Sequence, residues 1–315
     1  MTTNYTKITA VGIQKALENL KFLKLFDCCS SAQVLAKMHQ RAFENKLPDI
    51  PKYQLIDLHC TNDSFIELPY KSGSLQTAVS LCSQLLRLRL VTQEGMTDAD
   101  LLALVGLCNM QDFSIGAGEV CQVSFSNGIL PLLQFFGKTL QTLTIAEFSN
   151  VNVRSIIEYC PELRSIDLFM NNNYDSYWVD GKRKAAVCPA LKKLQSIQLV
   201  GTLHDDLEDD SVPEKHLSVL LLSSSLVHIY AKDCSTLTDN IFRKAHASHQ
   251  FSNLQHLELE RCHNFKPESA ELLLNPSNPL KKLLLWQCRL ISRQLVTKWS
   301  KIAEKKRWKL SLQWT

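Results

Sequence analysis

Cysteines, histidines and clustered carboxylates are the residues that could do chemistry, but their spacing does not form a catalytic or metal site. The chain has 11 cysteines and no Cys-x-x-Cys pair, so the usual zinc-site spacing is missing. His246 and His249 lie three residues apart on a predicted helix, with no third ligand near them in the sequence. Gly116 and Gly118 are not followed by the Gly-Lys-Ser/Thr of a phosphate-binding loop. We therefore expect no enzyme activity, no cofactor and no metal.

Two charged segments could attract a partner, although a solvated surface is the simpler interpretation of both. The acidic segment contains Asp205, Asp206, Glu208, Asp209, Asp210 and Glu214. The basic segment contains Lys298, Lys301, Lys305, Lys306, Arg307 and Lys309. The net charge of +4 is too small to indicate binding to a phosphate backbone, so we expect no nucleic acid.

Leucine dominates the composition, with 51 of the 315 residues. No apolar run approaches the roughly 20 residues that a membrane span needs. The first ten residues lack the basic and apolar regions of a signal peptide, so we expect a location in the cytoplasm or nucleus. The odd number of cysteines then suggests reduced thiols rather than a disulfide framework.

The leucines recur in a repeat of the form L-x-x-L-x-L-x-x-C. Copies that are complete or conservatively varied end at Cys28, Cys234, Cys262 and Cys288. Looser copies keep the three apolar positions and change the ninth residue. The ten copies begin at Leu20, Tyr53, Leu85, Met110, Leu140, Leu163, Leu194, Leu226, Leu254 and Leu280. The pattern of residues 308–312 predicts an eleventh strand after the tenth repeat.

A helical pattern follows most of the predicted strands. Thr97, Thr238 and Ser292 each precede apolar residues at helical spacing, as helix N-caps do. A unit of strand, turn and helix cannot bury its leucines alone, so the units must stack. The sequence therefore predicts an α/β leucine-rich-repeat solenoid in one domain over residues 1–315, a curved horseshoe with parallel strands on its concave face and helices outside.

The repeat resembles the cysteine-containing leucine-rich repeat of F-box/LRR proteins. The Cys-Pro-x-Leu opening of that repeat occurs at Cys160–Leu163, and its Leu-Thr-Asp helix start occurs at Leu237–Asp239. The resemblance covers nearly all of the chain and implies a substrate-binding domain of a ubiquitin ligase subunit. Its partners would include a Skp-type adaptor and a cullin if a longer form carries an F-box.

No F-box is visible in the sequence. Leu47 and Pro48 resemble the opening of one, but they lie between two repeats and a predicted strand follows them. An inter-repeat loop is the better interpretation of that segment. A repeat scaffold unrelated to ubiquitin, similar to a ribonuclease inhibitor or a GTPase regulator, is the alternative function.

The residues between the leucines of each strand should face the concave side, where a partner protein would bind. Large side chains of the kinds that dominate interfaces occur there. The candidates are Arg87, Arg89, Asp167, Phe169, Tyr230, Lys232, Glu258, Glu260 and Trp286. A polar and aromatic insertion offers a second candidate with Tyr174, Tyr177 and Trp178, and packing over the repeat core is the equal alternative for it.

Overall fold

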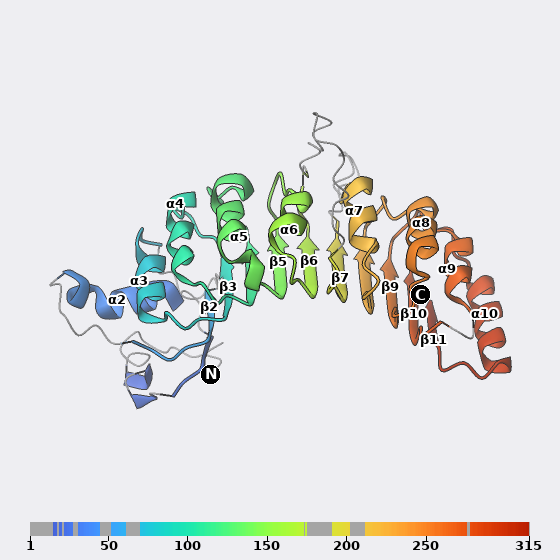
Figure 1. Ribbon diagram of the computed structural model, residues 1–315, viewed down its shortest axis with the longest axis horizontal. Coiled ribbons are helices and arrows are strands. Elements are labelled where there is room, and N and C mark those ends of the chain that lie inside the picture. The colour runs from blue at the N-terminus through green and yellow to red at the C-terminus, as the bar shows by residue number, and fades with distance from the viewer. Residues whose placement is uncertain are drawn as a thin grey trace. The chain divides into compact units, whose positions relative to one another are not determined.

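The computed structural model describes residues 15–17, 19–20, 22–27, 31–44, 52–60, 70–172, 174, 191–201, 212–275 and 278–314 (Figure 1). They fall into two compact units, one within residues 1–148 and one within residues 149–315. In each unit, parallel strands follow one another in chain order and alternate with helices. The predicted α/β leucine-rich-repeat fold is confirmed, whereas the single domain over residues 1–315 stays a prediction.

The described residues of the first unit form strands and α-helices that are joined by shorter helical turns. The strands are β1 (Leu25–Asp27), β2 (Asp57–Cys60), β3 (Arg87–Val91), β4 (Asp112–Gly116) and β5 (Thr142–Ala146). The helices are α2 (Ser31–Glu44), α3 (Ser74–Leu81), α4 (Asp98–Leu101) and α5 (Leu130–Phe136). A 3-10 turn over Leu102–Gly106 continues α4, and a π turn over Phe125–Ile129 leads into α5.

The described residues of the second unit form six strands and five α-helices. The strands are β6 (Ser165–Phe169), β7 (Ser196–Val200), β8 (His228–Lys232), β9 (His256–Glu260), β10 (Lys282–Trp286) and β11 (Ser311–Trp314). The helices are α6 (Val153–Tyr159), α7 (Glu214–Leu221), α8 (Asp239–His249), α9 (Pro267–Leu273) and α10 (Arg293–Lys305). Helices α8 to α10 follow one another along one side of strands β9 to β11 (Figure 1).

Alternation along each strand builds the core of the second unit. Successive side chains of a strand point to opposite faces, so the second and third apolar residues of each repeat share one face. Ile229, Leu257 and Leu283 stand at the same level of β8, β9 and β10 and are almost completely buried. The residues between these apolar positions lie on the opposite face, which we call the strand face.

Side chains at the N-caps start the helices where the sequence predicts. The hydroxyl of Thr238 accepts a hydrogen bond from the Ile241 amide at the start of α8. The hydroxyl of Ser292 accepts from the Leu295 amide at the start of α10. These bonds satisfy amide groups that have no partner within the first turn of a helix.

The predicted register is wrong in the first two repeats. Phe26 pairs with Leu58 and is only 2% exposed, whereas Leu20, the expected core residue, is 47% exposed. The second repeat likewise buries Leu55, Leu58 and Cys60 rather than beginning at Tyr53. In both segments the apolar residues fit the repeat in two alternative alignments. Pairing with the neighbouring strand selects the alignment that is observed.

The predicted eleventh strand exists but begins later than expected. Strand β11 pairs in parallel with β10, and Leu312 lies opposite Leu283. Trp308 belongs to the turn that ends α10, because its amide donates to the Ala303 carbonyl. Among the described residues, no helix has both the length and the apolar character that crossing a membrane requires.

Candidate protein-binding face

The register of β8, β9 and β10 brings the strongest candidate residues together on the strand face. Tyr230 lies opposite Glu258, and Lys232 lies opposite Glu260. Trp286 lies opposite Glu260 on the next strand, β10. Adjacent strands lie about 4.8 Å apart, so these side chains form one continuous patch. Equivalent positions of the repeat thus align across these three strands.

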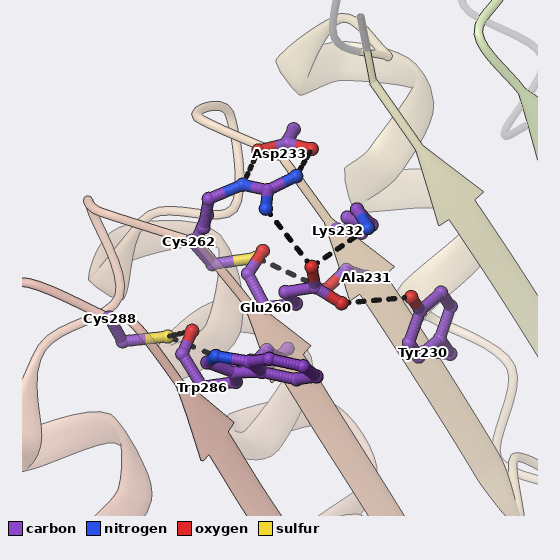
Figure 2. A network of polar contacts seen from close by, with 10 residues as sticks. Tyr230, Ala231, Lys232, Asp233, Glu260, Cys262, Trp286 and Cys288 are labelled. Carbon is purple, nitrogen blue, oxygen red and sulfur yellow. Dashed lines mark hydrogen bonds and ion pairs between the residues drawn. The ribbon is translucent and has the colours of Figure 1, made fainter. Parts of the chain in front are cut away.

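Glu260 is the centre of a polar network rather than an exposed member of the patch (Figure 2). The Lys232 ammonium lies 2.8 Å from Oε1 of Glu260, and Nη1 of Arg261 lies 3.1 Å from the same oxygen. The Tyr230 hydroxyl donates to Oε2 of Glu260 over 3.3 Å. Glu260 is only 8% exposed, so these three donors compensate the loss of its hydration.

Tyr230 is positioned by this network. Its hydroxyl is directed toward the Glu260 carboxylate, as Figure 2 shows. Burial, with the nearby Glu260 charge, raises the pKa of the Tyr230 phenol, which therefore stays a hydrogen-bond donor at neutral pH. The ring is thereby held in one orientation before any partner arrives, which lowers the entropy cost of binding.

Arg261 extends the network to the preceding repeat. Its Nε and Nη2 atoms each lie 2.6 Å from a carboxylate oxygen of Asp233. Both residues follow the last residue of a strand and adopt a left-handed backbone, with φ of 53° for Arg261 and 52° for Asp233. This conformation ends the strand and turns the two side chains toward each other, so the pair links consecutive repeats.

The cysteines at the ninth repeat position secure the turns behind this network. The Cys262 thiol lies 3.4 Å from the Ala231 carbonyl, and the Cys288 thiol lies 3.6 Å from the Leu259 carbonyl. Burial raises the pKa of both thiols, so they remain protonated donors. Cys262 and Cys288 therefore have a structural role as buried groups that hydrogen-bond to backbone.

The exposed part of the patch is aromatic, and its charges are paired. Trp286 is 44% exposed. The Lys282 ammonium lies 2.9 Å from Oε1 of Glu258. With the network around Glu260, each described charge of the patch therefore has an opposite charge beside it, and the aromatic rings supply the area that a partner could bury.

A pocket of about 310 Å³ opens beside the patch, above strands β7 to β9. The side chains around it are Ser196, Gln198, His228, Tyr230, His256 and Glu258. The rings of His228 and His256 lie against each other with centroids 4.6 Å apart. Burial, with the neighbouring His256, lowers the pKa of the His228 imidazole, so that ring is neutral at pH 7.

The remaining strand-face candidates lie apart from this patch. Asp167 and Phe169 lie on β6, where Asp167 is opposite Gln198 of β7. Arg87 and Arg89 lie on β3 of the first unit and are exposed. Arg87 is bound to Asp57 over 2.8 Å. The structure thus brings together the five candidates of β8 to β10, with Asp167 and Phe169 further along the same sheet.

The candidate insertion is only partly described. Tyr174 is 9% exposed, which favours the packing alternative for that residue. Tyr177 and Trp178 lie outside the described residues, as does the acidic segment from Asp205 to Asp210. The histidine pair on α8 has a structural use, because His249 contacts the Leu221 carbonyl and accepts from the Phe251 amide. In the described part of the chain, no three His, Cys, Asp or Glu side chains could hold a metal ion together.

Sequence reasoning missed the partners that hold the patch together. Asp233 and Arg261 occupy the eighth repeat position, which the apolar pattern leaves unspecified. Opposite charges at the eighth position of consecutive repeats were the available signal. The pocket beside His256 and Gln198 was not predicted, because the hollow depends on side chains from three neighbouring strands, β7 to β9, together.

Comparison with known proteins identifies no family for this chain. No protein-family model matches it, and no curated protein matches it in sequence. Among solved structures, one similar chain is a Bacteroides fragilis protein, with 13% identity and a TM-score of 0.40, over 74% of this chain and 66% of that one. Another belongs to the Rad7 and Elc1 complex of yeast, with 12% identity and a TM-score of 0.40, over 93% of this chain and 84% of that one. The chain thus spans less than two thirds of the Bacteroides protein, and both likenesses are too low to assign a function.

Proposed function

We propose that this protein is a non-catalytic recognition module that binds a partner protein through the strand face of β8 to β10. The observation that supports this function best is the exposed Trp286 beside a Tyr230 ring held by Glu260. Aromatic side chains that are fixed in place and surrounded by paired charges are typical interface hot spots.

The paired charges also favour a protein over a nucleic acid. Lys232, Lys282 and Arg261 are each bound to a carboxylate, so the described residues of β8 to β10 offer no set of unpaired cations to a phosphate backbone. A partner protein could bury the two rings while the ion pairs at their edge remain partly hydrated.

The double variant Tyr230→Ala/Trp286→Ala tests this function. Proteins that co-purify with the wild type would be identified by mass spectrometry, and their binding to purified variants would then be measured. The control is Leu290→Ala/Ile302→Ala, which removes two exposed apolar side chains outside the strand face. The proposal fails if the folded double variant of the strand face still binds every partner with the affinity of the wild type.

The more specific role that we propose is substrate binding for a ubiquitin ligase of the F-box/LRR type, acting in the cytoplasm or nucleus. It rests on the cysteine-containing repeat pattern, in particular Cys160–Leu163 and Leu237–Asp239. Co-purification of the protein with a Skp-type adaptor and a cullin would support this role. A partner that binds the strand face without either protein would instead support the ubiquitin-independent scaffold.

A further inference from the structure

We propose that the pocket above β7 to β9 is a specificity pocket that binds an arginine side chain of the partner protein. This inference rests on the proposed function, because it names the chemistry that the strand face would select. The argument depends on the groups that line the pocket and on their unused hydrogen-bonding capacity.

The pocket is lined by side chains that can accept hydrogen bonds, and one of them, Glu258, is a carboxylate that is paired with Lys282 through a single oxygen. Glu258 is the one charged residue among the described residues that line it. One carboxylate oxygen of Glu258, Oε1, accepts from Lys282, which leaves Oε2 for a ligand. Asp167, opposite Gln198 on the neighbouring strand, adds a second carboxylate close to the pocket. A phosphate or carboxylate ligand would meet the oxygens of Glu258, whereas a guanidinium could donate a hydrogen bond to Oε2 of that carboxylate.

The neutral side chains of the pocket suit the shape of a guanidinium. Within the described residues, the side-chain amide of Gln198 and the rings of His228 and His256 make no hydrogen bond to the protein. A neutral imidazole offers one nitrogen as an acceptor, and an amide offers its oxygen. A guanidinium has five N–H donors in one plane, so it can reach several of these acceptors at once.

The aromatic walls favour arginine for a second reason. A guanidinium stacks on aromatic faces and is more weakly hydrated than the ammonium of lysine. Tyr230, His228 and His256 supply such faces around the pocket. Contact between a cation and a Tyr face adds to the attraction of the carboxylates.

Binding of the arginine side chain should depend on pH, because the His228 imidazole lines the pocket. The titratable side chains at the pocket are His228 and Tyr230 on β8 and His256 and Glu258 on β9. Lys282 faces Glu258 from β10, and Asp167 approaches from β6. Protonation of the His228 imidazole would place a positive charge against the guanidinium and remove an acceptor, so acid should weaken binding.

N-acetyl-arginine amide is the probe for this pocket, and N-acetyl-citrulline amide is its neutral isostere. The imidazole carbon signals of labelled His228 and His256 would be followed by NMR during titration with each probe at pH 7.5, with His→Asn variants to assign the signals. We expect saturable shifts with the arginine probe and at least ~10-fold weaker binding of citrulline, because the charge-assisted hydrogen bonds are lost. Equal shifts with the two probes, or none with either, would overturn the proposal.

Three variants distinguish the effect of the Glu258 carboxylate on arginine binding from the effect of the protein's net charge. Glu258→Gln should weaken binding of the arginine probe about 10-fold, whereas Glu268→Gln, which removes the same charge from an exposed position on α9, should leave this binding unchanged. Lys282→Gln removes the cation that occupies Oε1 of Glu258 and should strengthen binding. An unchanged affinity in Glu258→Gln would contradict the proposal.

A failure of the arginine pocket can be distinguished from a failure of the proposed recognition function. Trp286 does not line the pocket, so Trp286→Ala tests the patch alone. If Trp286→Ala releases the partner while Glu258→Gln retains it, the recognition function stands and the arginine pocket is wrong. If the arginine probe binds as expected while Trp286→Ala has no effect on partners, the pocket stands and the wider binding face is wrong.

Discussion

The Arg261 guanidinium binds the Asp233 carboxylate of the preceding repeat through two hydrogen bonds of 2.6 Å each. The same guanidinium reaches Glu260 through its third nitrogen. One side chain therefore connects the turn of β8, the end of β9 and the carboxylate that orients Tyr230. This contact couples the stability of two repeats to the geometry of the candidate binding face.

Removal of the Arg261 guanidinium should therefore destabilise the protein. We expect Arg261→Leu to lower the free energy of unfolding by about 3 kcal/mol, because it leaves the buried Asp233 carboxylate without its bidentate partner. Urea unfolding would measure the change. Arg243→Leu is the matched control, since its bond to Asp239 lies on the surface of α8 and should contribute less than about 1 kcal/mol. Equal effects of the two substitutions would contradict a structural role of the Arg261 pair.

The core of the repeats should be sensitive to a single large-to-small substitution. Leu257 is fully buried between Ile229 and Leu283, so Leu257→Ala should cost ~2–5 kcal/mol by opening a cavity. Leu284→Ala, on the strand face of the next strand, should cost much less because that side chain is only partly buried. Denaturant unfolding of both variants would compare them, and a similar loss in each would show that the assignment of the two faces is wrong.

The thiols should react in the order of their burial. Cys108 is exposed, whereas Cys160 is fully buried and burial raises its pKa to about 12. We expect a thiol reagent at pH 8 to modify Cys108 rapidly and Cys160 only after unfolding, when all 11 cysteines become reactive. Mass spectrometry of peptides at timed intervals would give the order. Rapid modification of Cys160 in the native protein would refute this prediction.

The buried thiols also predict the response of stability to alkaline pH. The pKa of Cys82 and of Cys160 is raised to about 12, above the value of 9.0 for an unburied thiol. Between these values the unfolded chain has lost the thiol protons and the folded chain still binds them, so the free energy of unfolding falls as pH rises. Urea unfolding at pH 8 and pH 10 would measure the loss, and Cys160→Ala should show a smaller loss than the wild type.

The repeat pattern was sufficient to predict the fold because the same apolar spacing recurs along the chain. Each copy from Leu85 to Leu280 buries the residues that its spacing assigns to the core. The first repeat failed because Leu23, Leu25 and Phe26 allow two frames, and only the pairing of β1 with β2 selects the one that buries Phe26. Local spacing cannot contain that information, since it depends on a strand some 30 residues away.

The candidate site was predictable in position but not in its contacts. Alternation along the strands placed Tyr230, Glu258 and Trp286 on one face. It could not show that Glu260 is buried, because that burial results from Lys232 and Arg261 closing over the carboxylate. Contacts between side chains of different repeats depend on rotamers and on the turn conformation, which the sequence pattern does not specify.

The two aromatic residues of the patch should contribute unequally to partner binding. We expect Trp286→Ala to weaken the free energy of partner binding by more than ~2 kcal/mol, because a half-exposed indole can bury a large area at an interface. Tyr230→Phe keeps the ring and removes the hydrogen bond to Glu260, so it should cost about 1 kcal/mol through looser positioning. Calorimetric titration of a purified partner against each variant would measure both changes, with urea unfolding as the check on folding. A loss in Tyr230→Phe as large as that in Trp286→Ala would mean that the partner binds the phenol itself, and the patch would then act through polar recognition rather than through buried aromatic area.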